Sequence, residues 1–312
     1  MKIGLTTSMF IGAICAFAAS ATEPLAMPRI PSELTSPADR GAYLSVHYWD
    51  ALDFVDDARA ADTAFMEQAL VDFLSIMPHV PEQARRDGLA VMFGRASADE
   101  DASELLRLLC QIYLSDAGSP MRDERLYVDM LEADAMSQPE GSATGIRRMA
   151  LAEEMKKNLP GDVAADFAMV TADGGDAPAT LHRLVTRPTL MLVYNPDCGT
   201  CHEVIDAMKR DAALQRAVAV GTVSVLAVAV DTGRDMWESY RGNIPTEWVS
   251  ALDTDGIGDN EIYYVPETPM VYLIGGDCRV IDRGLYMLRA DGSFDSSLIA
   301  RLLQAAGDEY SH

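Results

Sequence analysis

The chain has 312 residues and a formal net charge of −23, with 48 acidic residues against 25 basic ones. A chain of this length can form two domains, each with its own hydrophobic core. The acidic balance argues against nucleic acid and anionic membrane surfaces as partners. The acidic residues are spread along the chain, which favours solvated faces over the alternative of an acidic groove for basic peptides.

The first residues have the features of a secretory signal peptide. Met1-Lys2 is positively charged, the next fifteen residues are mostly apolar, and Ala19-Ser20-Ala21 is a small-residue cleavage site. We therefore expect residues 1–21 to be removed, and the protein to be exported to the periplasm or cell envelope.

Two kinds of membrane attachment are not expected. Cys15 suggests a lipoprotein, but Ile14 stands where that processing requires a small residue, so a lipid anchor is disfavoured. No later segment is long and apolar enough for a transmembrane helix, so the chain is not predicted to be an integral membrane protein.

Residues 22–158 are predicted to form a linker followed by helices. Residues 22–40 are rich in Pro, Ser, Thr and Ala without a period, which predicts a linker and places the start of the folded part at Gly41. Residues 41–158 carry apolar side chains at helical spacing, which predicts an all-α helical domain. The expected helices are 62–77, 81–95, 102–114, 122–136 and 144–158.

The segment His47-Tyr48-Trp49-Asp50 lies ahead of these helices. An aromatic pair beside a titratable ring could bind a ligand. Large aromatic side chains mostly serve packing, however, so we interpret the segment as an anchor of the N-terminal residues on the helices.

The spacing of apolar residues changes after Leu159-Pro160-Gly161. Short apolar segments then alternate with helical ones, which predicts an α/β domain with a mixed sheet flanked by helices over residues 161–312. The expected strands are 167–171, 190–194, 224–230, 270–274 and 280–282, and the expected helices are 201–216, 236–240 and 296–306.

The motif Cys198-Gly199-Thr200-Cys201 indicates redox chemistry. It follows an apolar run typical of a buried strand and precedes a helical segment, so the cysteines lie at a helix N-terminus. The helix dipole and the free N–H groups there favour a thiolate, which is the nucleophile of disulfide exchange. We expect Cys198 to attack a substrate disulfide, and Cys201, one turn deeper, to resolve the mixed disulfide.

Two other interpretations of the motif stay open, namely half of a zinc or copper site and a structural disulfide. A structural zinc site needs four ligands, and the other cysteines form no second pair, so neither a metal nor another cofactor is expected. Cys110 falls on the apolar stripe of a helix and Cys278 in a turn. Both are therefore expected to be free thiols.

Residues 161–312 resemble the thioredoxin-like superfamily, in particular its exported TlpA-like branch. The resemblance is carried by Gly161–Phe167 as an entry strand, the turn Asp173-Gly174, the strand–CxxC–helix unit, and Glu267-Thr268-Pro269-Met270 before a strand. It implies a thioredoxin-like fold in which Pro269 is a cis-proline that faces the cysteines. It also implies that the backbone of Thr268 and Pro269 binds the substrate beside the sulfurs.

Two residues depart from the pattern of thioredoxin itself. Asp197 stands in place of the tryptophan that precedes the first cysteine, and Leu192 in place of the buried aspartate that helps to move protons. Glu203 and His202 are therefore candidates for proton transfer to Cys201. The alternative is that both are exposed residues of the first helical turn.

Residues 41–158 resemble a helical domain of unassigned function that precedes thioredoxin-like domains in exported proteins of anaerobic Gram-negative bacteria. The resemblance is carried by His47-Tyr48-Trp49-Asp50 and by Leu74–Pro81, and it implies no chemistry. The whole chain is thus predicted to be an exported thiol–disulfide oxidoreductase that reduces envelope proteins and is recharged by a membrane or periplasmic electron donor. The alternatives are an envelope binding or adaptor protein with a structural or inactive CxxC, and a metal chaperone.

Overall fold

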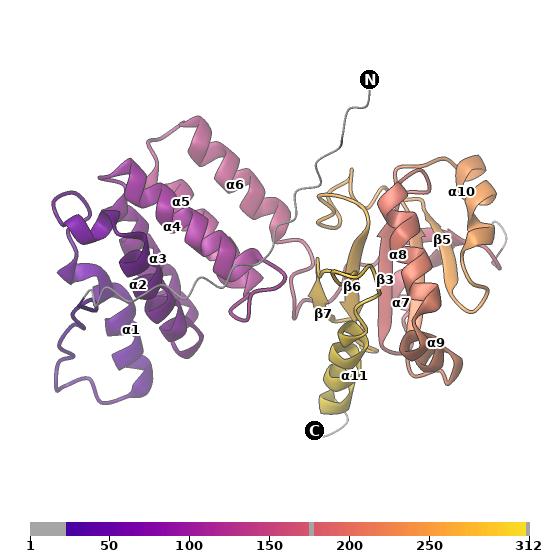
Figure 1. Ribbon diagram of the computed structural model, residues 1–312, viewed down its shortest axis with the longest axis horizontal. Helices are drawn as coiled ribbons and strands as arrows, with labels where there is room; N and C mark the ends of the chain where they lie inside the picture. Colours follow the sequence, from indigo (N-terminus) through magenta and orange to yellow (C-terminus); the bar gives the residue numbers. More distant parts are fainter. Residues whose placement is uncertain (1–22, 175–177, 310–312) are drawn as a thin grey trace.

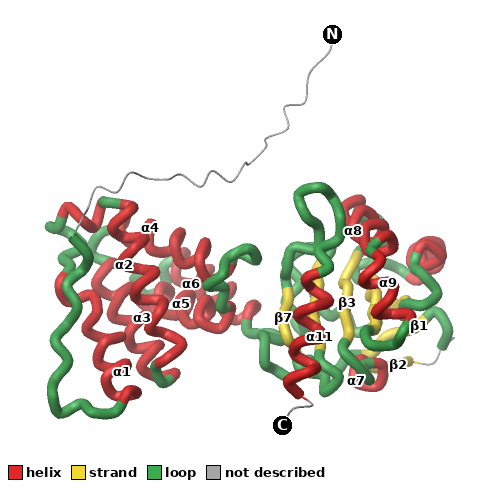
Figure 2. Tube along the Cα trace, turned by 60° about the horizontal axis from the view of Figure 1, so that its bottom comes forward, coloured by secondary structure: helices red, strands yellow, loops and turns green. Residues whose placement is uncertain are grey.

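The computed structural model describes residues 23–174 and 178–309, without the side chains of residues 306–309. A helical domain and a sheet domain lie beside one another and are joined after α6 (Figure 1). Figure 2 shows the same two parts from another direction. The predicted order of an all-α unit followed by an α/β unit is confirmed. In the described ranges, no helix is long and apolar enough to cross a membrane.

The helical domain contains the five predicted helices and one more before them. Side-chain caps fix where they begin: the carboxylate of Asp62 accepts hydrogen bonds from the backbone N–H groups of Ala64 and Phe65, and the hydroxyl of Ser142 from that of Gly145. The helices are α1 (Pro37–His47), α2 (Thr63–Ile76), α3 (Glu82–Ala96), α4 (Glu100–Cys110, continued by a wider turn at Gln111–Ser115), α5 (Glu124–Ser137) and α6 (Ala143–Met155).

Helix α1 shows that the predicted linker, 22–40, was too long at its C-terminal end. The hydroxyl of Ser36 accepts a hydrogen bond from the N–H of Asp39 at 3.0 Å, and Pro37 occupies the first helical position. Proline suits that position because its φ angle is already helical and its missing N–H would have no partner there. The folded part therefore begins before Gly41, and Leu25 is buried as well.

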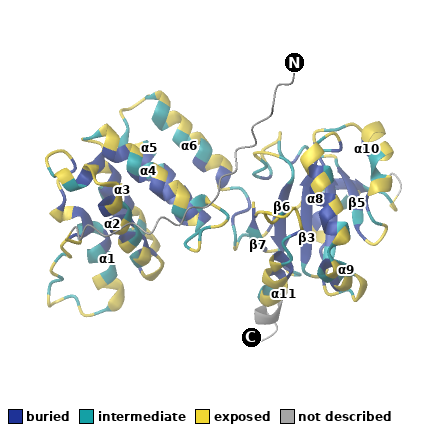
Figure 3. Cartoon of the chain, viewed as in Figure 1, coloured by how far each residue is buried: buried dark blue, intermediate teal, exposed yellow. Residues whose placement is uncertain are grey.

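The segment His47-Tyr48-Trp49-Asp50 serves packing, as predicted. Tyr48 and Trp49 are buried, and both rings pack against Phe73 of α2, with centroids 5.3 and 5.6 Å from the Phe73 ring. The Tyr48 hydroxyl donates a hydrogen bond to the carbonyl of Ala69 at 2.9 Å. The aromatic pair thus joins the turn after α1 to α2 inside the core that Figure 3 shows in dark blue.

Among the described residues, the sheet of the second domain has seven strands in the order β2-β1-β5-β4-β3-β6-β7. The central strands β3, β4 and β5 run parallel, and the others pair antiparallel with their neighbours, which makes the sheet mixed as predicted. The strands are β1 (Ala168–Thr171), β2 (Pro178–Thr180), β3 (Thr189–Tyr194), β4 (Ser224–Ala229), β5 (Val249–Asp253), β6 (Met270–Ile274) and β7 (Val280–Arg283).

Two cores cover the two faces of this sheet. Alternate residues of β3 belong to different cores, because successive side chains of a strand point to opposite faces. Leu192 and Tyr194 lie in the core that contains Cys201 and helices α8, α9, α10 and α11, whereas Met191 packs on the other face with α7. The helices are α7 (Leu181–Leu184), α8 (Gly199–Arg210), α9 (Ala212–Ala219), α10 (Arg234–Tyr240) and α11 (Ser297–Glu309).

The structure corrects several sequence-based expectations in this half, among them the entry strand at Gly161–Phe167, since the first strand begins only at Ala168. Strands β2 and β5 were not predicted, and β5 is a central strand that hydrogen-bonds to both β1 and β4. The single helix predicted over 201–216 is two helices. They part at Asp211, whose side chain accepts a hydrogen bond from the N–H of Leu214 at 2.7 Å and so caps α9.

Candidate redox site

The redox motif lies at the junction of β3 and α8. After the strand, the Asn195 side-chain oxygen accepts a hydrogen bond from the N–H of Asp197 at 2.8 Å, and the Asn195 carbonyl accepts one from the N–H of Cys198 at 3.0 Å. These bonds form the turn that leads into the helix. Cys198 is the N-cap residue of α8, and its sulfur accepts a hydrogen bond from the N–H of Cys201 at 3.2 Å.

The environment of Cys198 favours its thiolate. Partial burial by itself would raise the pKa of this thiol. Hydrogen bonds from the thiol and backbone N–H of Cys201, with further ones at Thr268 and Thr200, outweigh burial and leave the pKa below the ordinary value of a cysteine. Because the side chain is also partly exposed, Cys198 combines access with thiolate character.

Cys201 has the opposite properties. Its side chain is buried among the apolar residues of α8 and the sheet. Burial raises the pKa of its thiol to about 12, and hydrogen bonding to Cys198 adds to this rise. Cys201 is therefore protonated at neutral pH until the reaction itself changes its surroundings.

Thr268 and Pro269 face the motif, as the resemblance implied. Their peptide bond is cis, and they come directly before β6, which pairs with β3. The Cys198 thiol lies 3.5 Å from the Thr268 carbonyl and donates a hydrogen bond to it. Two segments about 70 residues apart in the chain thus meet at the reactive sulfur.

The two candidates for proton transfer lie differently. Glu203 is exposed to solvent. The His202 ring donates from Nε2 to the Pro196 carbonyl at 2.7 Å and stacks on Tyr240, with ring centroids 4.7 Å apart. Burial is the main cause that raises the pKa of Tyr240 to about 12, with smaller contributions from the charges of Asp206, Cys201 and Cys198. Tyr240 therefore lies against the residue that follows Cys201, and the sequence pattern did not single it out.

The residues that depart from thioredoxin also have clear positions. Leu192 is fully buried in the core that contains Cys201, so an apolar side chain occupies the interior beneath the motif. Asp197 is exposed, directly before the first cysteine.

Cys110 and Cys278 are free thiols, as predicted. Cys110 is buried in the helical domain, and burial raises its pKa well above the usual range. Cys278 lies in the turn between β6 and β7 at a positive φ of 65°. Within residues 23–174 and 178–309, no group of three or more His, Cys, Asp or Glu side chains is arranged to hold a metal ion.

A cleft beside the motif was not anticipated from the sequence. It has a volume of about 450 Å³, and its lining includes Thr200, Thr268 and Pro269 from the redox site. It also includes Arg122 and Met155 from the helical domain. Only the fold could reveal it, because its walls come from two domains that are far apart in sequence.

Comparisons with known proteins agree with this architecture. A crystal structure of a thioredoxin-like protein from Bacteroides caccae is similar over both domains, with 28% sequence identity and a TM-score of 0.62; the match covers 85% of this chain and 95% of that one. Residues 7–158 match the family model of a domain of unknown function, DUF5106. The search of curated proteins gave no match.

Two further structures match a smaller share of the chain. The thioredoxin domain of a thiol-disulfide oxidoreductase from Bacteroides vulgatus has 16% identity and a TM-score of 0.37, and the match covers 47% of this chain and 97% of that one. A conserved protein of unknown function from Bacteroides fragilis has 31% identity and a TM-score of 0.39, with 41% of this chain and 93% of that one covered.

The fold and the match that spans both domains define the class of protein. The chain consists of a helical domain followed by a thioredoxin-like domain, which confirms the resemblance of residues 161–312. Its helical part matches the model of the DUF5106 domain, and over both domains the chain is similar to a thioredoxin-like protein.

Proposed function

We propose that the protein is an exported thiol–disulfide oxidoreductase that reduces disulfides of envelope proteins. The observation that carries the proposal is the contrast between the two cysteines. Cys198 is accessible with a lowered pKa, whereas Cys201 is buried with a raised pKa. This is the arrangement that an attacking thiol and a resolving thiol require.

The reaction has two steps. The Cys198 thiolate attacks one sulfur of a substrate disulfide, which forms a mixed disulfide and releases the other substrate sulfur as a thiolate. Cys201 then loses its proton and attacks the Cys198 sulfur, which releases the second substrate sulfur and leaves a Cys198–Cys201 disulfide. Two electrons pass to the substrate, and a membrane or periplasmic dithiol donor must return them.

The substrate is held by backbone groups in this proposal. Thr268 and Pro269 lie across from Cys198, and the Thr268 carbonyl is already within hydrogen-bonding distance of its sulfur. An extended substrate segment can pair with this backbone next to the reacting sulfur, as a strand pairs with a sheet edge. His202 and Glu203 remain candidates for proton transfer, and Tyr240 joins them by its position.

Reduction of insulin by dithiothreitol tests this proposal and separates it from the adaptor alternative. The mature protein should accelerate the reaction, and the variants Cys198→Ser and Cys201→Ser should not. An adaptor with an inactive motif would leave the insulin rate unchanged. Retention of stoichiometric zinc or copper after reducing purification would support a metal chaperone instead.

A further inference from the structure

The cleft beside the redox motif has walls from both domains. The thioredoxin-like domain supplies Thr268 and Pro269, and also Leu285 and Met287 from the segment after β7. The helical domain supplies Ser115, Arg122 and Met155, so the end of α6 and the segment between α4 and α5 close the other side. The DUF5106 domain thus reaches the place where a substrate of Cys198 must lie.

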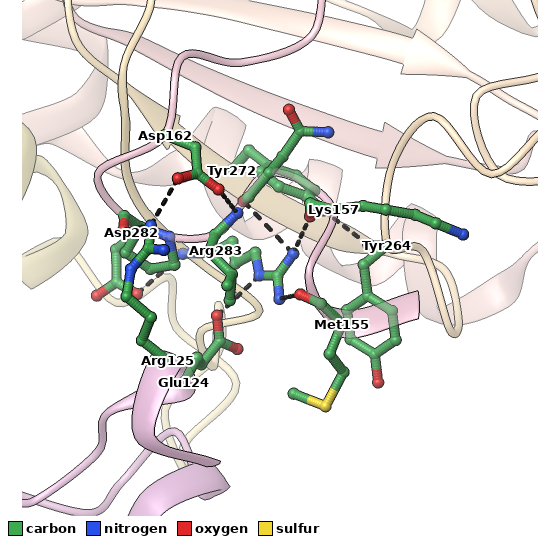
Figure 4. Close-up of polar contacts among 12 residues, drawn as sticks. Glu124, Arg125, Met155, Lys157, Asp162, Tyr264, Tyr272, Asp282 and Arg283 are labelled. Carbon is green, nitrogen blue, oxygen red and sulfur yellow. Dashed lines mark hydrogen bonds and ion pairs between the residues drawn. The ribbon is translucent and has the colours of Figure 1, made fainter. Parts of the chain in front are cut away.

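A buried ion pair holds the two walls together. Arg283, at the end of β7, is fully buried, and its Nε donates to Glu124 of α5 at 2.7 Å. Its Nη2 donates to the Met155 carbonyl at 2.6 Å, and its Nη1 to the Lys157 carbonyl (Figure 4). Nη1 also lies 3.4 Å from the Asn158 carbonyl and donates to it. One side chain of the sheet therefore satisfies the last carbonyl of α6 and two carbonyls of the segment directly after it.

Arg122 makes a second connection. It is nine-tenths buried, and it forms ion pairs with Asp282 at 2.6 Å and with Glu124 at 2.9 Å. It also donates to the carbonyl of Arg283 at 2.7 Å. At the surface, the Tyr286 hydroxyl reaches Asp116 at 3.3 Å. These contacts fix the position of the helical wall relative to the redox site.

The chemistry of the cleft favours an apolar group. Most of its lining side chains are apolar, among them Val204, Tyr264 and Met287. Its two buried charged residues, Arg122 and Glu124, already pair with each other. Glu267, which also lines the cleft, is exposed and acidic, and its charge disfavours the binding of acidic substrate segments. Thr268 both contacts the Cys198 sulfur and lines the cleft. A group bound in the cleft therefore belongs to the same substrate molecule that reacts at Cys198.

We propose that the DUF5106 domain selects substrates of the thioredoxin-like domain by binding an apolar side chain that flanks the reacting cysteine. The occupant is an extended polypeptide segment whose cysteine lies at Cys198 and whose neighbouring side chain enters the interdomain cleft. This inference rests on the proposed redox function. It adds a role for the helical domain, namely substrate recognition.

The test measures how fast Cys198 forms mixed disulfides with two peptides. Each peptide carries one cysteine as a mixed disulfide with 2-nitro-5-thiobenzoate. In the leucine peptide both residues next to this cysteine are leucine, and in the glycine peptide both are glycine. The full mature chain with Cys201→Ser attacks the peptide sulfur and releases the coloured thiolate. We expect the leucine peptide to react about tenfold faster, a difference of about 1.4 kcal/mol that partial burial of a leucine supplies.

Substitutions in the helical wall show whether that domain causes the preference. Ser115 is half-buried in the cleft wall, so Ser115→Trp should fill the cleft and bring the ratio of the two rates close to one. Ser115→Asp, which adds little bulk, should also lower the ratio because it puts a charge beside the leucine. Ser75 is exposed on α2 and outside the cleft lining, so Ser75→Trp and Ser75→Asp should keep the tenfold ratio.

The parent protein of this test is the mature chain with Cys201→Ser alone. Equal rates for the two peptides with the parent protein would overturn the inference, as would a tenfold ratio that persists in both Ser115 variants. Failure of the proposed function looks different. In that case, the parent protein would not react even with hydroxyethyl disulfide, which needs no cleft, and this inference would fall together with the redox role.

Discussion

The Arg283–Glu124 ion pair provides a quantitative test of how the two domains are joined. In the variant Arg283→Met, the apolar bulk is largely kept while the charge and all donors are lost. Glu124 then keeps only its pair with Arg122 at 2.9 Å, and the carbonyls of Met155, Lys157 and Asn158 lose their donor. Removing one partner of a buried pair costs about 3–5 kcal/mol, and each orphaned carbonyl adds about 1 kcal/mol.

We expect Arg283→Met to lower the free energy of unfolding by about 6 kcal/mol, the lower end of this sum, since the remaining pair of Glu124 reduces part of the charge penalty. Guanidinium unfolding followed by tryptophan fluorescence measures this change. The chain has three tryptophans, and Trp49 lies in the helical domain, whereas Trp237 and Trp248 lie in the other. A Trp49→Phe background therefore reports on the thioredoxin-like domain alone.

The matched control is Arg301→Ala. Arg301 forms an ion pair of 2.8 Å with Asp282 at the same domain border, but its side chain is 52% exposed. Exposed pairs contribute less than about 1 kcal/mol. If Arg283→Met destabilised the protein no more than Arg301→Ala does, the buried network would not be what joins the domains, and the reasoning would be refuted.

Three further predictions concern the redox site and export. In cells, Cys201→Ser should accumulate mixed disulfides through Cys198, whereas Cys198→Ser should accumulate few because the remaining thiol is buried; equal trapping by both variants would contradict the assigned roles. Alkylation of Cys198 by iodoacetamide should rise with pH through a midpoint below that of an unperturbed cysteine in a reference peptide, because only the thiolate reacts and the Cys198 pKa is lowered. Cys201, whose pKa is raised to about 12, should stay unmodified at neutral pH; mass spectrometry of each peptide decides this. The intact mass of the secreted protein should correspond to cleavage after Ala21, and a retained Met1 or a diacylglycerol on Cys15 would contradict it.

Local patterns in the sequence predicted the redox motif and its surroundings. The buried strand, turn and helix around Cys198 follow one another within 22 residues, and each has a strong signal in its own residues. Strand β5 (Val249–Asp253) is not evident from the sequence because it depends on pairing with the distant strand β1, and strand β2 (Pro178–Thr180) because it has only three residues and begins with a proline. Helix α1 is not evident from composition because proline is common in linkers, although Ser36-Pro37 is also a typical helix start.

The cleft and its ion pairs lie beyond such local patterns. Arg122 contacts Asp282, 160 residues later in the chain, and nothing in either segment indicates the other. Tyr240 is likewise brought to His202 only by the packing of α10 near the start of α8. Site residues that are close together in the sequence could thus be predicted. Those that are brought together only by the tertiary structure could not.

The reduction potential of the Cys198–Cys201 pair tests the central claim most directly. Titration of the mature protein in glutathione buffers should show one two-electron transition that either Cys→Ser variant abolishes. The helix N-terminus favours the Cys198 thiolate, but Gly199 and Thr200 add no cation and the exposed Asp197 opposes the negative charge. A thiolate that is less stabilised makes the disulfide harder to reduce. We therefore expect a reduction potential on the reducing side of about −180 mV. A value near about −120 mV would contradict the reductant role, and the absence of any Cys198–Cys201 disulfide would contradict the redox site itself.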